Sequence, residues 1–167
     1  MLQDHAKIVR FLALAGEVTG RKKLQKMIFI AKKMNYSFQE KYNFHIYGPY
    51  SEELTVRVEE LCNLGFLTEV KENKGAYEQY CYTATDAGLK FMTIVQEDQK
   101  DLQKLVQQMN QKSSRFLELV STLLYFEHLT ELEQMKKVYT VKAKLKFTEQ
   151  EMVDAFAFIK QLKIEGN

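Results

Sequence analysis

Leu64-Gly65-Phe66-Leu67 and Tyr82-Thr83-Ala84-Thr85-Asp86-Ala87-Gly88 are the two stretches of sequence that decide the fold. Gly65 is expected to end a helix, because glycine readily takes the left-handed conformation that follows a last helical turn. In the second stretch, Thr85 is an expected helix cap, and Gly88 lies one turn further on, where a bare backbone allows close packing. A helix therefore ends at the first stretch, and another begins at the second.

Two runs of β-prone residues, 66–71 and 76–83, lie between these helices. They flank Glu72-Asn73-Lys74-Gly75, whose residue types are typical of a tight turn. The pattern predicts a β-hairpin.

Three helices are expected before the hairpin, over residues 3–15, 20–34 and 52–64, because apolar residues recur there at helical spacing; the third is the helix that Gly65 ends. Thr19 is the expected cap of the second helix, and Ser51 that of the third. The order helix, helix, helix, hairpin, helix is that of a winged helix-turn-helix.

The remainder of the chain is expected to be helical. The helix after the hairpin is predicted to be long and to end near Gln111, and Thr130–Glu133 and Thr148–Glu151 match the T-x-x-E capping box. We therefore predict an α+β, mostly helical protein, with a winged-helix domain over residues 1–90. A helical extension over residues 91–167 packs on it, and its long helix is the expected interface of a homodimer.

Composition excludes several classes of protein. The 167 residues are 46% hydrophobic and 28% charged with a net charge of +2, which is typical of a globular domain and too balanced for a general polyanion binder. Cys62 and Cys81 are far apart in sequence, so neither a disulfide framework nor a zinc knuckle is expected. The chain shows no signal peptide and no run of about 18 apolar residues, so we expect a cytoplasmic protein without a membrane span.

The sequence carries no pattern typical of an enzyme. His5, His45 and His128 each lack a second ligand at helical spacing, so no metal site is expected. Phosphate-binding loops, dinucleotide fingerprints and nucleophile elbows are all missing from the sequence. We expect a non-enzymatic protein without a cofactor.

Three segments carry a family resemblance: Lys23-Leu24-Gln25-Lys26-Met27-Ile28-Phe29, Tyr47-Gly48-Pro49-Tyr50-Ser51-x-Glu53-Leu54 and Leu64-Gly65-Phe66-Leu67. Together with Glu118–Thr122 and Lys144–Ala155, they resemble the YwgA-type bacterial proteins over nearly the whole chain. That family has no established biochemical activity.

Residues 23–67 also resemble, more distantly, the SocA-like antitoxin (Panacea) domain, which shares the Lys-Leu-Gln-Lys helix and the Tyr-Gly-Pro turn. This resemblance implies an antitoxin-like role, either neutralising a toxin or handing a partner to a protease through protein contacts. No catalytic residue transfers from either family.

The outward face of the third helix argues against simple DNA recognition. Leu54, Val58 and Leu61 share the inward face at 100° per residue. The opposite face carries Glu52, Val56, Glu59, Glu60 and Asn63. Carboxylates on the face that would enter the major groove meet phosphate repulsion.

Basic residues elsewhere offer a second kind of contact. They lie on the second helix and on the predicted wing, and can bind phosphates without reading bases: Arg21, Lys22, Lys23, Lys26, Lys33, Lys71 and Lys74. The alternative is that they form a solvated face. Phe29 lies among these lysines, either as a partner contact or covered by the C-terminal helices.

The turn Tyr47-Gly48-Pro49-Tyr50 is interpreted as structural, because glycine and proline fix the backbone that leads into the third helix. Whether it also has a functional role stays open in the sequence. Two hypotheses follow from these observations. The first is a regulatory or adaptor module that acts through protein–protein contacts. The alternative is a dimeric DNA-binding transcriptional regulator that contacts phosphates through the second helix and the wing.

Overall fold

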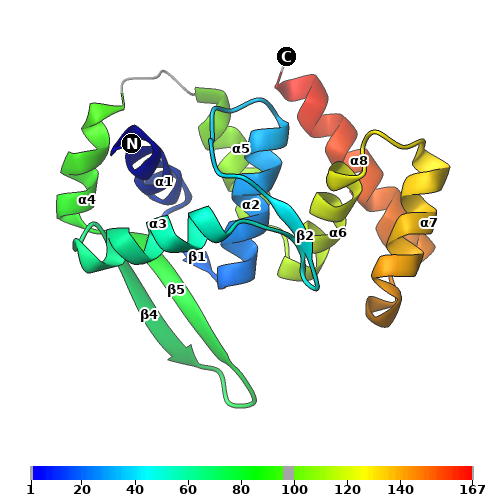
Figure 1. Ribbon diagram of the computed structural model, residues 1–167, viewed down its shortest axis with the longest axis horizontal. Coiled ribbons are helices and arrows are strands. Elements are labelled where there is room, and N and C mark those ends of the chain that lie inside the picture. Colours follow the sequence, from blue (N-terminus) through cyan, green and yellow to red (C-terminus); the bar gives the residue numbers. More distant parts are fainter. Residues whose placement is uncertain (1, 96–99, 167) are drawn as a thin grey trace.

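The computed structural model describes residues 2–95 and 100–166, and its chain is mixed α and β and mostly helical (Figure 1). Its helices are α1 Leu2–Ala15, α2 Arg21–Lys33, α3 Glu52–Asn63, α4 Asp86–Phe91, α5 Lys100–Asn110, α6 Ser114–Tyr125, α7 Glu131–Val141 and α8 Glu149–Glu165. The strands are β1 Val18–Thr19, β2 Asn43–His45, β3 Gly48–Tyr50, β4 Leu67–Asn73 and β5 Glu78–Ala84.

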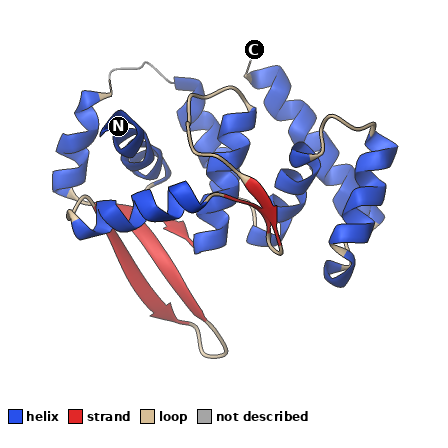
Figure 2. Cartoon of the chain, in the orientation of Figure 1, coloured by secondary structure: helices blue, strands red, loops and turns tan. Residues whose placement is uncertain are grey.

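The predicted hairpin is confirmed and forms most of a three-stranded antiparallel sheet. β4 and β5 pair from Leu67 opposite Ala84 to Asn73 opposite Glu78. β1 adds only two residues on the other edge of β5. The far end of the hairpin therefore projects from the helical body (Figure 2).

A second, small hairpin, which the sequence analysis did not predict, joins α2 to α3. β2 and β3 pair with His45 opposite Gly48, so the chain reverses at Ile46 and Tyr47. Gly48 has a φ of +87°, which a residue with a side chain rarely adopts. β3 packs on both α2 and α6.

Most predicted helix caps are confirmed. The Ser51 side chain accepts a hydrogen bond from Leu54 N, and that of Thr85 from Gly88 N. Both predicted capping boxes are also present, at Thr130 and Thr148. These caps depend only on residues three apart, which is why the sequence reveals them.

The prediction that Thr19 caps α2 is wrong. Thr19 belongs to β1 and lies opposite Cys81, while α2 begins after Gly20 without any side-chain cap. Gly20 has a φ of +114°, and its N–H donates to the carbonyl of Tyr80 at 2.8 Å. This strand contact therefore fixes the start of α2.

The prediction of one long helix from the hairpin to Gln111 is also wrong. α4 ends at Phe91, a 3₁₀ turn follows over Met92–Ile94, and Val95 has an extended backbone. Residues 96–99 of the predicted helix lie outside the described residues. The separate helix α5 packs its apolar face against α1 and α2. The buried residues of this face are Leu102, Leu105, Val106 and Met109, so they are not available to form a dimer interface.

One apolar core joins the N-terminal and C-terminal parts of the chain. Its buried residues run from Ile8 on α1 to Leu162 on α8, and α2 lies between α5 and α6. The division into domains at residue 90 stays a prediction. Within the described ranges, no helix has the length and apolarity that crossing a bilayer requires.

Candidate functional site

The basic residues predicted on α2 do not form one exposed patch. Lys26 is only 1% exposed and Phe29 is buried, because α6 covers this side of α2. Phe29 packs on Tyr42 and Tyr125, so the alternative that the C-terminal helices cover it is confirmed. The expectation that Lys26 lies on an open, phosphate-binding face is therefore wrong.

The other lysines of α2 each have a partner. Lys23 donates to the carbonyl of Asn110 at 2.8 Å, and Lys33 forms an ion pair with Glu127 at 3.2 Å. Lys22 is exposed, and its ammonium lies 3.3 Å from the centroid of the Tyr47 ring.

The hairpin cations are matched by acids. Lys71 pairs with Glu78 at 2.9 Å, and Lys74 with Glu72 at 3.1 Å. Arg21, at the start of α2, lies over the Tyr80 ring and pairs with hairpin residue Glu69 at 3.2 Å. These pairs leave little unbalanced positive charge for a phosphate backbone.

The β2–β3 turn is held by two buried lysines from distant parts of the chain. Lys26 on α2 donates from Nζ to the carbonyl of Pro49 at 2.8 Å. Lys142, directly after α7, donates from Nζ to the carbonyl of Ile46 and is 4% exposed. The predicted structural turn is thus fastened on both sides of Gly48.

Positive charge exceeds negative charge beneath this turn. Burial lowers the pKa of Lys26 to about 8 and also lowers that of Lys142, and the Glu118 carboxylate partly opposes both shifts. Glu118 lies 3.9 Å from the Lys142 ammonium. A Cβ on Gly48 would lie 3.4 Å from Thr122 Oγ1, in van der Waals contact with α6, so the positive φ rather than a clash is what favours glycine there.

The start of α3 is fixed to α2 by a side-chain amide. Gln25 donates from Nε2 to the carbonyl of Ser51 at 2.9 Å, and its Oε1 accepts from Ser51 N at 2.9 Å. Because Ser51 is also the N-cap, this contact sets where α3 leaves the small hairpin.

A groove of about 540 Å³ lies on the outer face of α3, between the start of α1 and the end of α4. Its apolar lining comes from three helical segments: Leu2, Val56, Leu64 and Phe91. Val56 is 51% exposed and Leu64 is 61% exposed, so large apolar surface is open to solvent. We call this feature the α3 groove.

The rim of the α3 groove is acidic. Glu52, Glu53 and Glu60 line it, and the exposed Glu59 adjoins Glu60 on α3. The basic residues of the lining already contact acids. The Arg57 guanidinium forms ion pairs with Asp4, Glu40 and Glu53, and His5 Nε2 lies 3.7 Å from the Glu60 carboxylate.

Glu40 shows how acidic this region is. Its carboxylate is 1% exposed and bonds to Arg57 through one oxygen, while the other oxygen has no hydrogen-bond partner. Burial raises the pKa of Glu40, and the neighbouring Arg57 lowers it. The Arg57 charge is therefore shared among Asp4, Glu40 and Glu53, so it offsets the negative charge of the groove rim only in part.

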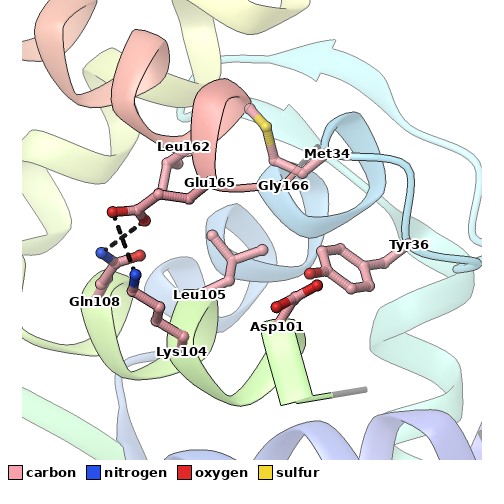
Figure 3. A pocket seen from close by; sticks show the side chains of 9 residues that line it. All are labelled: Met34, Tyr36, Asp101, Lys104, Leu105, Gln108, Leu162, Glu165 and Gly166. Atoms are coloured by element: carbon pink, nitrogen blue, oxygen red, sulfur yellow. Dashed lines mark hydrogen bonds and ion pairs between the residues drawn. The ribbon is translucent and has the colours of Figure 1, made fainter. Parts of the chain in front are cut away.

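A smaller pocket of about 120 Å³ lies where α5 and α8 meet the end of α2 (Figure 3). Glu165 accepts from Gln108 at 3.0 Å and pairs with Lys104 at 3.4 Å, and these contacts lower the pKa of Glu165. Gln108 and Lys104 on α5 thus fasten the end of α8 through Glu165. Within residues 2–95 and 100–166, no cluster of His, Cys, Asp and Glu is placed to hold a metal ion.

Sequence reasoning found only part of the groove. It placed Val56 and the carboxylates on the outward face of α3, but Leu2 and Phe91 reach that face only through tertiary packing. The available signal was Val56 and Leu64, two apolar residues on or beside an otherwise acidic surface.

The chain is 54% identical over 163 residues to the uncharacterised protein YwgA of Bacillus subtilis (strain 168). The similarity covers 98% of this chain and 98% of that protein. No protein-family model matches the chain.

Proposed function

This chain belongs to the YwgA family, and we propose that it is a non-enzymatic adaptor whose α3 groove binds a basic amphipathic helix of a partner protein. The observation that carries the proposal is the exposure of Val56 and Leu64 beside the α3 carboxylates that line the same groove. Grooves that accept a helix hold its apolar face through side chains spaced one turn apart.

Charge complementarity indicates the kind of helix. The outer face of α3 carries four carboxylates, and the basic residues of the groove lining, Arg57 and His5, already contact acids. The four are Glu52, Glu53, Glu59 and Glu60. Lysines and arginines flanking the apolar stripe of a partner would meet these acids, whereas an acidic helix would be repelled. The resemblance of residues 23–67 to the SocA-like antitoxin domain supports a protein-binding role, because it implies action through protein contacts.

We interpret the scaffold as a winged helix-turn-helix with the small β2–β3 hairpin inserted between α2 and α3. α3 then occupies the position of the recognition helix, and β4–β5 that of the wing. Since α3 presents carboxylates and the wing lysines are paired with acids, this scaffold suits a protein partner better than DNA. We also propose a cytoplasmic location, because Cys62 and Cys81 are both free thiols.

A designed peptide tests the proposal. A fluorescent helix of about 18 residues carries leucines at i, i+3, i+4 and i+7 and lysines elsewhere, and its anisotropy is followed on titration with the protein. A peptide with glutamates in place of the lysines keeps the same apolar stripe. We expect the lysine peptide to bind, with weaker binding at high salt, and the glutamate peptide to remain free.

Two exposed positions provide the matched variants. Val56→Asp should weaken binding of the lysine peptide by about tenfold or more, because it places a charge on the groove floor. Val70→Asp, at a similarly exposed valine on the hairpin, should leave binding unchanged. Equal binding by both variants, or binding of neither peptide by the unmodified protein, would overturn the proposal.

A further inference from the structure

The β2–β3 turn presents two large apolar side chains to solvent. Ile46 is 85% exposed and Tyr47 is 52% exposed. Lys22 lies over the Tyr47 ring and adds a positive charge at the same place. We call Lys22, Ile46 and Tyr47 the Tyr47 tip.

The backbone under the Tyr47 tip is held more firmly than a short surface turn requires. Burying an ammonium group is costly, yet Lys26 and Lys142 are both buried with their amines on carbonyls of this turn. A turn fixed in advance loses little conformational entropy on docking. Aromatic side chains held in this way are typical anchors of protein interfaces.

The positive charge at the Tyr47 tip indicates what kind of surface could bind it. Lys22 is the exposed cation beside Tyr47, whereas Lys26 and Lys142 are buried beneath the turn, where Glu118 acts on both amines. The surface that fits this tip is therefore apolar in the centre and acidic at the rim. The α3 groove has this chemistry, and its volume of about 540 Å³ lies in the usual range of pockets that take a ligand.

We propose that the Tyr47 tip of one copy docks into the α3 groove of a second copy. This inference rests on the groove of the proposed function, so the second copy and the partner helix would compete for one site. The contact joins unlike surfaces, and it therefore builds a ring or an open chain of molecules instead of a simple twofold dimer.

Two complementary variants test this contact. Tyr47→Asp removes the tip and keeps the groove, whereas Val56→Asp removes the groove and keeps the tip. In sedimentation velocity at about 100 μM, a concentration suited to a weak interface, the unmodified protein should self-associate and each variant alone should be a monomer. An equimolar mixture of the two variants should form a dimer, because one intact tip meets one intact groove.

Tyr77→Asp is the matched control, since Tyr77 is a similarly exposed tyrosine on the far end of the larger hairpin, and this variant should associate like the unmodified protein. A monomeric unmodified protein, a mixture that stays monomeric, or undiminished association of Tyr47→Asp would each overturn the inference. Circular dichroism checks that the variants are folded. If Tyr47→Asp is unfolded, Ile46→Asp takes its place, because that side chain is the more exposed one.

The lysine peptide separates this inference from the proposed function. Peptide binding without self-association would overturn the tip contact alone. If the protein self-associates but neither binds the lysine peptide nor is dissociated by it, the helix-binding function of the groove would be overturned and the tip contact would stand.

Discussion

Lys26 Nζ lies 2.8 Å from the carbonyl oxygen of Pro49, so the central helix α2 holds the turn that leads into α3. The lysine is 1% exposed and is flanked by a second buried amine, that of Lys142. The position of α3 therefore depends on a buried ammonium group.

The stability of the protein should depend on pH through Lys26. Burial lowers its pKa to about 8, whereas an unfolded lysine titrates near 10.4. Between these values the unfolded chain binds a proton that the folded chain has released, so the free energy of unfolding rises with pH, by up to about 1.4 kcal/mol per unit. Relative to Lys26→Met, the unmodified protein should gain stability from pH 8 to pH 10 in urea unfolding. Parallel profiles for the two proteins would refute this.

Removing the carboxylate beneath the turn should destabilise the protein. Glu118→Gln leaves the buried amines of Lys26 and Lys142 without their nearby acid, and we expect a loss of about 2 kcal/mol at pH 7. The loss should shrink at pH 10, where Lys26 is largely neutral. Glu127→Gln breaks exposed ion pairs with Lys33 and Lys163 and should cost less than about 1 kcal/mol. Equal losses in chemical unfolding would contradict the role given to Glu118.

Gly88 should not tolerate even a methyl group. A Cβ at this position would lie 2.1 Å from the carbonyl oxygen of Phe66, a backbone atom that cannot move aside alone. We expect Gly88→Ala to destabilise the protein by about 3 kcal/mol, measured by urea unfolding. Ala87→Ser, at the exposed neighbouring position, is the control and should be nearly neutral. A stable Gly88→Ala protein would show that α4 packs less closely on the hairpin.

The two threonines of the capping boxes should differ from Thr19. Thr148→Ala and Thr130→Ala each remove an acceptor for a backbone N–H and should cost about 1 kcal/mol. Thr19→Val keeps a β-branched residue in β1 and should change stability by less than about 0.5 kcal/mol, because Thr19 caps no helix. Thermal unfolding of the three variants checks this, and a large loss for Thr19→Val would contradict the structure.

The features that the sequence predicts well are local. Ser51, Thr85 and the two capping boxes act on backbone groups within three residues, and the stop at Gly65 needs only its own left-handed φ of +79°. Long-range contacts account for the failures. Thr19 has the residue type of a helix cap, but in the structure it lies in β1, opposite Cys81 of β5. The apolar spacing of α5 continues that of α4 in the sequence, but α5 is a separate helix that packs on α1 and α2.

In the candidate site, too, the local features could be predicted from the sequence and the long-range contacts could not. The carboxylates and Val56 share a face that helical periodicity already defines, whereas Leu2 and Phe91 join them only after folding. The sequence predicts that Lys26 is exposed, because most lysine side chains lie at the protein surface. Its burial depends on the packing of α6 and β3 against α2, which the sequence pattern of α2 does not reveal.

The most direct test of the central claim is a side-by-side anisotropy titration of the fluorescent lysine peptide and of random-sequence duplex DNA, at about 50 mM and about 200 mM salt. We expect the protein to bind the peptide through the α3 groove and to leave the duplex free at both salt concentrations. Tight duplex binding that collapses at the higher salt, together with no binding of the peptide, would instead identify a phosphate-binding protein and refute the adaptor function.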